Sequence, residues 1–331
     1  KSSPGKIGFS LPDSDCPEVL LNDNINSNLL RKEKLQLPEL SEPEIVRHFI
    51  NLSSKNYHID KGFYPLGSCT MKYNPKINDL IAGLDNFKNI HPLQDLSTIQ
   101  GCLEVLYNLE KILNIITGMD STTLQPSAGS QGEFAGILVM SKYHEMNGNK
   151  KNNIIIPESA HGTNPSSVVL AGFNPVKVNT NSNGRVDIDD LKNKVDANTA
   201  GMMLTQPNTL GLFENHIEKI SDIIHKVDGL MYMDGANLNA LLGIARPSDM
   251  GFDITHINLH KTFSTPHGGG GPGAGPVAVN KKLSDYLPTP IVKSDGSIFY
   301  FKELGQSIGK VHSFFGNYGV LLRAYVYILS L

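Results

Sequence analysis

The sequence contains no apolar run close to the roughly 20 residues that a membrane-spanning helix needs. Its N-terminus lacks a signal-peptide core and an initiator methionine, so we expect the chain to begin inside a longer gene product. There is also no strong excess of charge of one sign. The net charge is −3, and Lys and Arg are scattered along the chain. We therefore expect neither nucleic acid nor an anionic membrane as the main partner.

Cysteine is scarce as well. Cys16, Cys69 and Cys102 cannot all pair with one another, and they form no C-x-x-C motif. A reducing compartment is the simplest interpretation of such cysteines, and their spacing gives no structural zinc site. We therefore expect no metal ion in this protein.

What is present suits an ordinary globular fold. The chain has 331 residues, 40% of them hydrophobic and 18% charged, enough for one large α/β domain or one domain plus a smaller piece. Residues 1 to about 40 are polar and Asn-rich, which is typical of an extended arm. In "SEPE", Ser41 and Glu44 form a capping box that opens a helix. We expect residues 1–60 to form an N-terminal arm and helix, and 61–331 to form the large domain.

Short apolar segments alternate with helical patterns through the middle of the chain. Helical spacing is found at 103–116, 134–143 and 217–227. The predicted strands are Ile154–Ile156, Val176–Val178, Met202–Thr205, Leu230–Met233, Ile254–Leu259 and Val277–Val279. They are continuous apolar runs, as expected for strands covered on both faces. The pattern predicts a mostly parallel, three-layer α/β sheet, in which ligands bind beyond the carboxyl ends of the strands.

Two motifs could hold an anion and a cation at those ends. The segment "QPSAGSQGE" (125–133) precedes a helix, and its small residues leave backbone N–H groups free for a phosphate. It could equally be an ordinary Gly/Ser turn. Asp234 ends an apolar strand, so its carboxylate is aimed at a semi-buried site and needs a partner. The alternative for Asp234 is a helix N-cap.

Two further residues follow predicted strands. Lys261 comes after Ile254–Leu259; most lysines lie at the surface, but a partly buried one becomes a nucleophilic amine of the Schiff-base kind. His161, in "ESAHGTNPSS", follows Ile154–Ile156 by a short loop. A loop histidine is more often structural than catalytic, but the position of His161 at a strand end favours a role in the functional site.

Together these features are the parts that pyridoxal phosphate needs. The phosphate requires the amide-rich helix start, the aldehyde requires an amine, and the pyridine nitrogen requires a carboxylate. A carboxylate about 4 Å from the pyridinium contributes roughly 4 kcal/mol at an effective dielectric of 20, which keeps the ring cationic. The four glycines of "PHGGGGPG", residues 268–271, would let the bare backbone turn past the cofactor and re-enter the sheet.

Six long segments of the sequence resemble one family. They are "GFYPLGSCTMKYNP", "QPSAGSQGE", "ESAHGTNPSS", "QPNTLGLFE", "YMDGANLNA" and "NLHKTFSTPHGGGGPG". They closely resemble the glycine decarboxylase P-protein of the glycine cleavage system, in its catalytic β subunit. The resemblance runs from about residue 10 to the end of the chain, including "SFFGNYGVLLRAYVYI".

The resemblance implies a fold type I, aspartate-aminotransferase-like large domain with pyridoxal phosphate on Lys261. It also implies that Asp234 pairs with the pyridine nitrogen and that His161 stacks on the ring. The phosphate would be bound by Ser127, Ala128, Gly129 and Ser130, with Thr209 and Ala236 near the cofactor. Ser68, Cys69 and Asn74 would offer polar groups to the glycine carboxylate or the lipoyl sulfurs, although Cys69 could equally be a buried small residue.

The implied reaction is decarboxylation of glycine through an aldimine with pyridoxal phosphate. The aminomethyl group would pass to the lipoyl arm of H-protein, with Lys261 or His161 carrying the proton. The family's smaller C-terminal domain is expected to lie outside this chain, which ends at Leu331. A separate α subunit, in an α2β2 assembly, is the expected partner. A bacterial cytoplasm and a mitochondrial matrix both fit, and a separate β subunit favours the bacterial one.

Three alternatives remain at this point. "HGGGG" (267–271) and "GQSIG" (305–309) resemble an esterase's oxyanion loop and nucleophile motif, but residues 308–331 contain no acidic residue to complete a triad. "NLHK" would suit another fold type I enzyme, an aminotransferase or a cysteine desulfurase. A non-catalytic partner subunit is the third, and the presence of both Asp234 and Lys261 argues against it.

Overall fold

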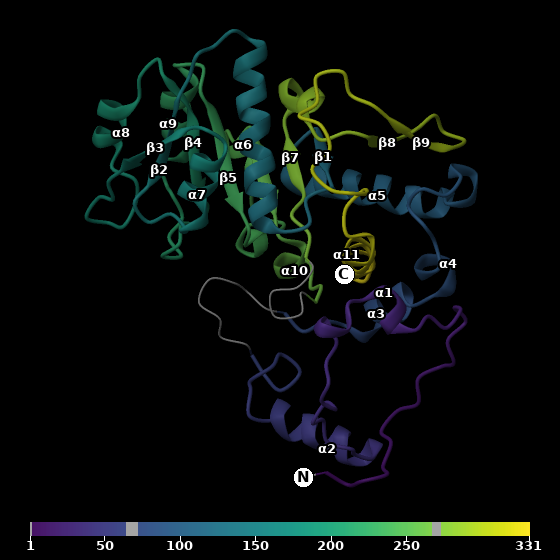
Figure 1. Ribbon diagram of the computed structural model, residues 1–331. Coiled ribbons are helices and arrows are strands. Elements are labelled where there is room, and N and C mark those ends of the chain that lie inside the picture. Colours follow the sequence, from purple (N-terminus) through teal and green to yellow (C-terminus); the bar gives the residue numbers. More distant parts are fainter. Residues whose placement is uncertain (1, 64–71, 267–272) are drawn as a thin grey trace. The chain divides into compact units, whose positions relative to one another are not determined.

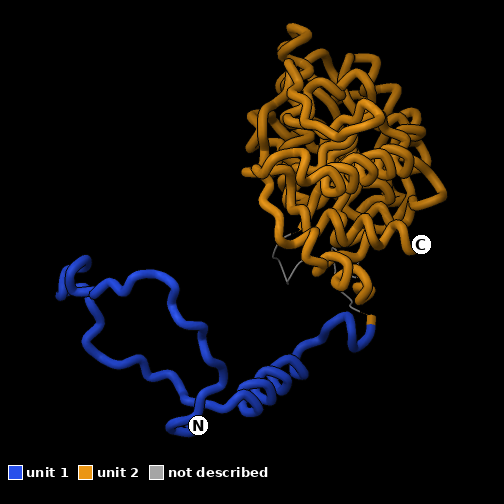
Figure 2. Tube along the Cα trace, turned by 90° about the vertical axis from the view of Figure 1, so that its right-hand side faces the viewer, with its two compact units in different colours: residues 1–62 blue, residues 63–331 orange. Residues whose placement is uncertain are grey.

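The computed structural model describes residues 2–63, 72–266 and 273–331 (Figure 1). The chain divides into two compact units, residues 1–62 and residues 63–331 (Figure 2). In the first unit, the elements are α1 (Leu21–Asn24), a 3-10 turn (Ser27–Leu29) and α2 (Glu42–Ser53). The predicted capping box is confirmed, because the Glu44 carboxylate accepts from the Ser41 N–H at 2.8 Å. No residue of α1 or α2 is buried.

The second unit contains the sheet. Its helices are α3 (Lys76–Ala82), α4 (Asp85–Lys88), α5 (Gln100–Thr117), α6 (Gly129–Met146), α7 (Thr163–Leu170), α8 (Ile188–Lys194), α9 (Ile217–His225), α10 (Leu259–Thr262) and α11 (Tyr318–Leu329). Its strands are β1 (Ser121–Thr123), β2 (Asn153–Pro157), β3 (Asn174–Val178), β4 (Thr199–Thr205), β5 (Leu230–Gly235), β6 (Ile254–Ile257), β7 (Val277–Val279), β8 (Ile291–Ser294) and β9 (Phe299–Lys302).

Seven strands form one sheet in the order β1-β7-β6-β5-β4-β2-β3. The five strands from β6 to β3 pair in parallel, and β7 pairs antiparallel with both β6 and β1. The predicted fold class, a mostly parallel α/β sheet, is confirmed. Strand β1 and the hairpin β8–β9 were not predicted, because short polar or isolated strands carry little periodic signal.

Helices cover both faces of this sheet, as Figure 1 shows. On β2, Ile154 and Ile156 pack into an apolar cluster with residues of α6 and α7. The intervening Ile155 packs into a second cluster that contains residues of α5, α8, α9 and α11. Alternate residues of one strand therefore enter different cores, which explains why the predicted strands read as continuous apolar runs.

The strand before Lys261 is shorter than predicted. It ends at Ile257, and the chain then turns into α10, a single helical turn that carries Lys261. The Asn258 carbonyl accepts from the N–H groups of Lys261 and Thr262, both at 3.0 Å. Apolarity at Leu259 suggested a continued strand, but Leu259 is buried on the helical turn instead.

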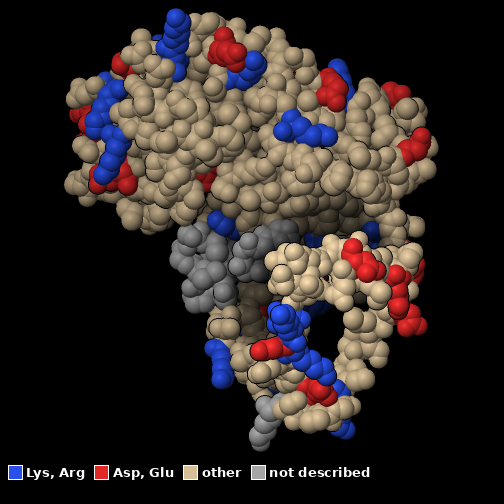
Figure 3. Space-filling view, in the orientation of Figure 1, with Lys and Arg blue, Asp and Glu red and all other residues tan. Residues whose placement is uncertain are grey.

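Across the described residues, no helix has both the length and the apolarity to cross a membrane. On the face of residues 63–331 drawn in Figure 3, basic and acidic side chains are interspersed. The face drawn shows no patch of one charge sign that would indicate a partner of the opposite charge.

Candidate functional site

A cavity of about 520 Å³ opens at the carboxyl ends of the central strands. Its lining includes residues from the starts of α6 and α7, the loop after β4, the end of β5 and α10: Gly129, Ser130, Glu133, His161, Thr163, Thr205, Asn208, Thr209, Asp234, Ala236, Asn239, Asn258, His260 and Lys261. A second cavity, of about 690 Å³, lies against α5 and the start of α11 and is lined mainly by apolar side chains. The convergence of titratable groups favours the first as the site of chemistry.

Asp234 occupies the end of β5 and is only 4% exposed. Its carboxylate accepts from Asn164 Nδ2 at 3.0 Å and from the Ala236 N–H at 3.1 Å. Burial raises the pKa of Asp234, but the charge of His256, these two hydrogen bonds and the charge of Lys261 outweigh it and hold the pKa below its ordinary value. Asp234 therefore stays ionised at neutral pH and is available to a cation in the cavity.

The start of α6 forms another wall. Among the described residues, no side chain caps this helix, whose first residues are Gly129 and Ser130, so its positive end faces the cavity. A Cβ on Gly129 would overlap the Asn258 side chain, and one on Gly275 would overlap the Ala128 carbonyl. Glycine is required at both places because the start of α6 lies against Asn258, just before α10, and the turn before α6 lies against the chain that leads into β7.

Of the predicted phosphate residues, Gly129 and Ser130 line the cavity, whereas Ser127 and Ala128 do not. The Ser127 N–H and hydroxyl both bond Gln131 Oε1, at 2.6 and 2.8 Å. These two bonds fix the turn that leads into α6 and leave the helix start open.

The other predicted cofactor residues lie around the same cavity. Lys261 projects from α10, His161 lies just before α7, Thr209 follows β4 and Ala236 follows β5. His161 is exposed, and its Nδ1 lies 2.8 Å from Thr163 Oγ1. The topology thus brings residues 161, 209, 234, 236 and 261 together although they are far apart in sequence.

Of the three predicted substrate residues, the structure describes only Asn74. Ser68 and Cys69 lie outside the described residues, as do the glycines at 268–271. Asn74 is described but does not line the cavity; its Oδ1 contacts the Ser264 hydroxyl at 3.3 Å. Lys72 was not among the predicted site residues, and its ammonium donates to the Thr262 carbonyl at 2.7 Å. The segment from 72 to 74 is therefore tied to the chain around α10.

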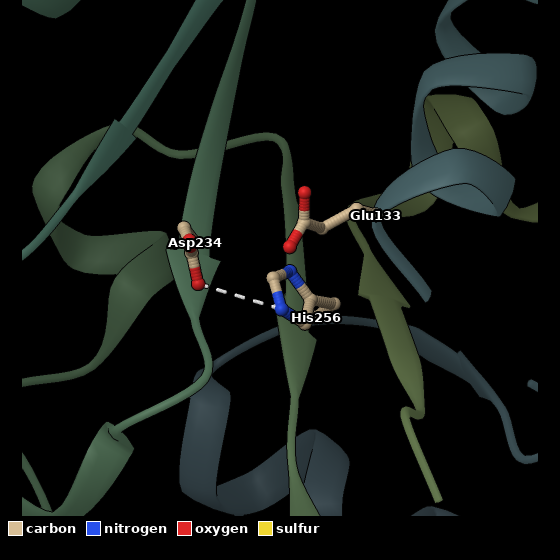
Figure 4. Close-up of side chains that lie close together, drawn as sticks. All are labelled: Glu133, Asp234 and His256. Atoms are coloured by element: carbon tan, nitrogen blue, oxygen red, sulfur yellow. Dashed lines mark ion pairs between the residues drawn. The ribbon is translucent and has the colours of Figure 1, made fainter. Parts of the chain in front are cut away.

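Two buried polar residues beside Asp234, Glu133 and His256, were not predicted as site residues. Glu133 comes from α6, Asp234 from β5 and His256 from β6, and one ligand atom of each lies within 4.8 Å of the others (Figure 4). His256 Nε2 makes an ion-pair contact of 3.4 Å with Asp234 Oδ1. A metal ion could bridge such a spacing, but side-chain donors already occupy both Glu133 oxygens, so hydrogen bonds satisfy that carboxylate. Glu133 was visible in the sequence only as the last residue of "QPSAGSQGE", just before the predicted helix.

The cavity's own polar atoms fit a bound pyridoxal phosphate. Thr205 Oγ1, Asn258 Oδ1 and both amide atoms of Asn239 are buried without a hydrogen-bond partner among the described residues. Buried polar atoms without a hydrogen-bond partner are expected where a bound polar ligand supplies the missing hydrogen bonds. The set also supplies an amine, a carboxylate and an open helix start, the three groups that this cofactor requires.

Comparison with known proteins decides the family. The family model described as glycine cleavage system P-protein matches residues 14–296. A relative from Chlorobium chlorochromatii, named probable glycine dehydrogenase (decarboxylating) subunit 2, is 54% identical over 331 residues, covering 100% of this chain and 69% of its own.

The chain belongs to the glycine cleavage system P-protein family. A second relative with the same name, from Bacillus licheniformis, is also 54% identical and covers 100% of this chain and 68% of its own. The predicted family and enzyme class are therefore confirmed.

Solved structures agree on the fold. A crystal structure of glycine decarboxylase (P-protein) in inhibitor-bound form has a TM-score of 0.75 at 17% identity, over 94% of this chain and 71% of that one. A NifS-like protein reaches a TM-score of 0.58 at 15% identity, over 79% and 67%. A cysteine desulfurase from Escherichia coli has a TM-score of 0.56 at 14% identity, over 77% of this chain and 63% of that one. The desulfurase alternative thus shares the fold, and the family match separates it from this chain.

The esterase alternative finds no support in the described residues. Ser307, its candidate nucleophile, lies in a loop after β9, where its hydroxyl donates to the Leu287 carbonyl at 2.6 Å and accepts from the Gly309 N–H at 2.9 Å. The hydroxyl is therefore committed to holding the loop. The matching "HGGGG" segment lies outside the described residues.

Proposed function

We propose that this chain is the glycine-decarboxylating subunit of a P-protein, which holds pyridoxal phosphate on Lys261. The observation that carries the proposal is the convergence of Lys261, Asp234, His161 and the open start of α6 on one cavity, in a chain of this family. When bound, the cofactor supplies an electron sink for the negative charge left on the glycine Cα as CO₂ departs.

The chain's own residues have distinct proposed roles. The Lys261 amine anchors the cofactor and, once displaced by glycine, can carry a proton at Nζ. Asp234 would pair with the pyridine nitrogen and keep its proton in place. Gly129 and Ser130 present backbone N–H groups to the phosphate.

Three further residues complete the proposed site. His161 would cover one face of the ring and is the second candidate for proton transfer. Thr209 and Ala236 border the cofactor from the loops after β4 and β5. Ser127 and Ala128 do not line the cavity, so we assign them to shaping the turn before α6.

We further propose that the aminomethyl group passes to the oxidised lipoyl arm of H-protein. A separate α subunit, in an α2β2 assembly, is the proposed partner, since relatives carry the name subunit 2. Because the relatives are bacterial, we propose a bacterial cytoplasm as the location of this glycine catabolism.

Two measurements test this function. Protein mixed with pyridoxal phosphate is expected to show the visible absorbance of a lysine-bound cofactor, and Lys261→Ala to lose it. Protein with its α subunit and H-protein is expected to exchange labelled carbon between bicarbonate and glycine. A band that survives in Lys261→Ala contradicts the cofactor assignment, and exchange with alanine but not glycine moves the chain to the aminotransferases.

A further inference from the structure

Glu133 lies at the junction of two hydrogen-bonded paths, one leading to His161 and the other to Asp234. We propose that Glu133 is a positioning residue of this site, which fixes the tautomer of His161 through Thr163 and the orientation of Asp234 through Asn164. The inference rests on the proposed function for the meaning of His161 and Asp234. The bonds themselves lie within the protein and can be tested without the cofactor.

The Glu133 carboxylate is buried and fully occupied. It is 5% exposed, on the first turns of α6. Thr163 Oγ1 donates to Oε1 at 2.8 Å, while Asn164 Nδ2 and Ser167 Oγ donate to Oε2, each at 3.1 Å. Three donors around one carboxylate are what a buried negative charge requires, so we take Glu133 as ionised.

The path to His161 runs through one hydroxyl proton. Thr163 has a single hydroxyl hydrogen, and a bond to a carboxylate is stronger than one to a neutral ring nitrogen, so this hydrogen belongs to Glu133. Thr163 Oγ1 then presents lone pairs to His161 Nδ1 at 2.8 Å. Nδ1 must therefore carry a proton, since two lone pairs at that distance would repel.

A second contact of Thr163 favours the opposite tautomer. Its backbone N–H points at His161 Nδ1, but at 3.3 Å it is longer than the hydroxyl contact and involves no charge. The hydroxyl contact therefore decides while Glu133 is ionised. In neutral His161, Nε2 is then left without a proton and can accept one in the cavity.

The path to Asp234 runs through one amide. Asn164 is fully buried and gives one Nδ2 hydrogen to Glu133 at 3.1 Å and the other to Asp234 Oδ2 at 3.0 Å. The reverse amide orientation is excluded, because Asn164 Oδ1 would then face two carboxylates. Glu133 therefore locks Asn164, and Asn164 fixes the rotation of Asp234.

Nuclear magnetic resonance of the cofactor-free protein, labelled with ¹⁵N-histidine, tests the first path. Long-range ¹H–¹⁵N spectra are expected to show His161 with Nδ1 protonated, the signal being assigned by its loss in His161→Gln. Thr163→Val keeps the shape but removes the hydroxyl, so Nδ1 is left with only the backbone N–H and the Nε2–H form is expected to dominate.

Ser166→Ala is the matched control on the same helix. Ser166 is exposed and its hydroxyl donates to the Gly162 carbonyl, away from Glu133, so the His161 spectrum is expected to stay unchanged. An Nε2–H tautomer in the unaltered protein, or no change in Thr163→Val, would overturn the role of Glu133 toward His161.

Glu133→Gln tests the second path. The side-chain amide nitrogen of the new glutamine must face either Asn164 or the Thr163 hydroxyl. If Asn164 rotates so that its Oδ1 accepts from this nitrogen, the same Oδ1 also faces the Asp234 carboxylate. The affinity for pyridoxal phosphate, titrated by absorbance, is expected to fall about tenfold, the equivalent of one lost hydrogen bond. Ser166→Ala is expected to bind normally.

The outcomes separate the two proposals. If the unaltered protein fails to bind pyridoxal phosphate, the proposed function is wrong, whatever the tautomer of His161. If it binds, and Glu133→Gln changes neither the affinity nor the His161 spectrum, the positioning role is wrong and the proposed function stands. If Glu133→Gln does not fold, the Thr163→Val spectrum still decides the inference.

Discussion

Two buried aspartates lie at opposite ends of the same pair of parallel strands, each with a histidine beside it. Asp234 ends β5 and lies opposite His256, whereas Asp253 directly precedes β6. Asp253 has a full set of partners: His225 Nε2 at 2.7 Å, the Met231 N–H at 2.8 Å, Lys282 Nζ at 2.8 Å and Asn280 Nδ2 at 2.6 Å. For both, burial raises the pKa and the partners reverse this, leaving it below the ordinary value.

The difference lies in what surrounds each carboxylate. The side chains of His225 and Lys282 close the Asp253 end. At the Asp234 end, the histidine is 3.4 Å away, and polar atoms of Thr205 and Asn258 in the same cavity have no partner among the described residues. A carboxylate that the protein satisfies completely holds the fold together, and one left with open neighbours is arranged for a ligand.

The largest effect is expected for Asp234→Asn. The variant keeps the shape but loses the charge that is proposed to pair with the pyridine nitrogen, so glycine–bicarbonate exchange should fall on the order of 10³-fold, as about 4 kcal/mol of attraction is lost. The urea midpoint should change little. If the urea midpoint of Asp234→Asn falls as far as that of an Asp253 variant, the two aspartates do not differ in their contribution to stability.

Asp253→Ala is expected to be the most destabilising change. It leaves the Met231 N–H and Asn280 without an acceptor, and removes the carboxylate that pairs with Lys282 and His225. The free energy of unfolding should fall by about 3 kcal/mol, near the lower end for a broken buried pair because the partners can reach water. Urea denaturation measures this. Pyridoxal phosphate affinity should be unchanged, and a matching loss of affinity would break the comparison.

Two glycine variants, one near each aspartate, are expected to have effects of intermediate size and so sharpen the comparison. Gly251 has φ +86°, and a Cβ there would lie 2.8 Å from the Ser221 Cβ, so Gly251→Ala should cost about 2 kcal/mol of stability with normal cofactor binding. Gly129→Ala would push on Asn258 and weaken cofactor binding. Gly101→Ala, where a Cβ meets nothing within 4 Å, is the control for both.

The smallest effect concerns pH. Because the pKa of Asp253 is lowered in the folded state, its contribution to stability is present above its ordinary value of 3.8 and is lost as pH falls through the lower, folded pKa. Asp253→Asn should therefore flatten the decline of unfolding free energy below about pH 4, measured by urea titration at several pH values. An unchanged slope would mean that other carboxylates carry the acid sensitivity.

Much of the fold was readable in the sequence because buried parallel strands are continuous apolar runs. The prediction for Leu230–Met233 lies within β5, and that for Val277–Val279 matches β7. The prediction was wrong at residues 258 and 259, where a helical turn buries Leu259 as well as a strand would. The polar strand β1 was missed because Ser121–Thr123 has no apolar signal.

The candidate site divides in the same way. Lys261, Asp234 and His161 were found because each follows an apolar strand within a recognisable motif. Glu133, Asn164 and His256 were not, because a polar residue on a buried helix face or in mid-strand looks the same whether its neighbours are satisfied or not. Only the partners, contributed by other elements, distinguish the cases.

The sequence by itself determined the fold class, the family and the residues with reactive groups, because periodicity and contiguous motifs are local properties of the chain. The tertiary structure decided which of those residues meet in one cavity, and which of two buried aspartates is saturated. It also decided that Ser127 and Ala128 stay outside the cavity while Glu133 joins His161 to Asp234. Those facts depend on hydrogen bonds between residues distant in sequence, which no local pattern encodes.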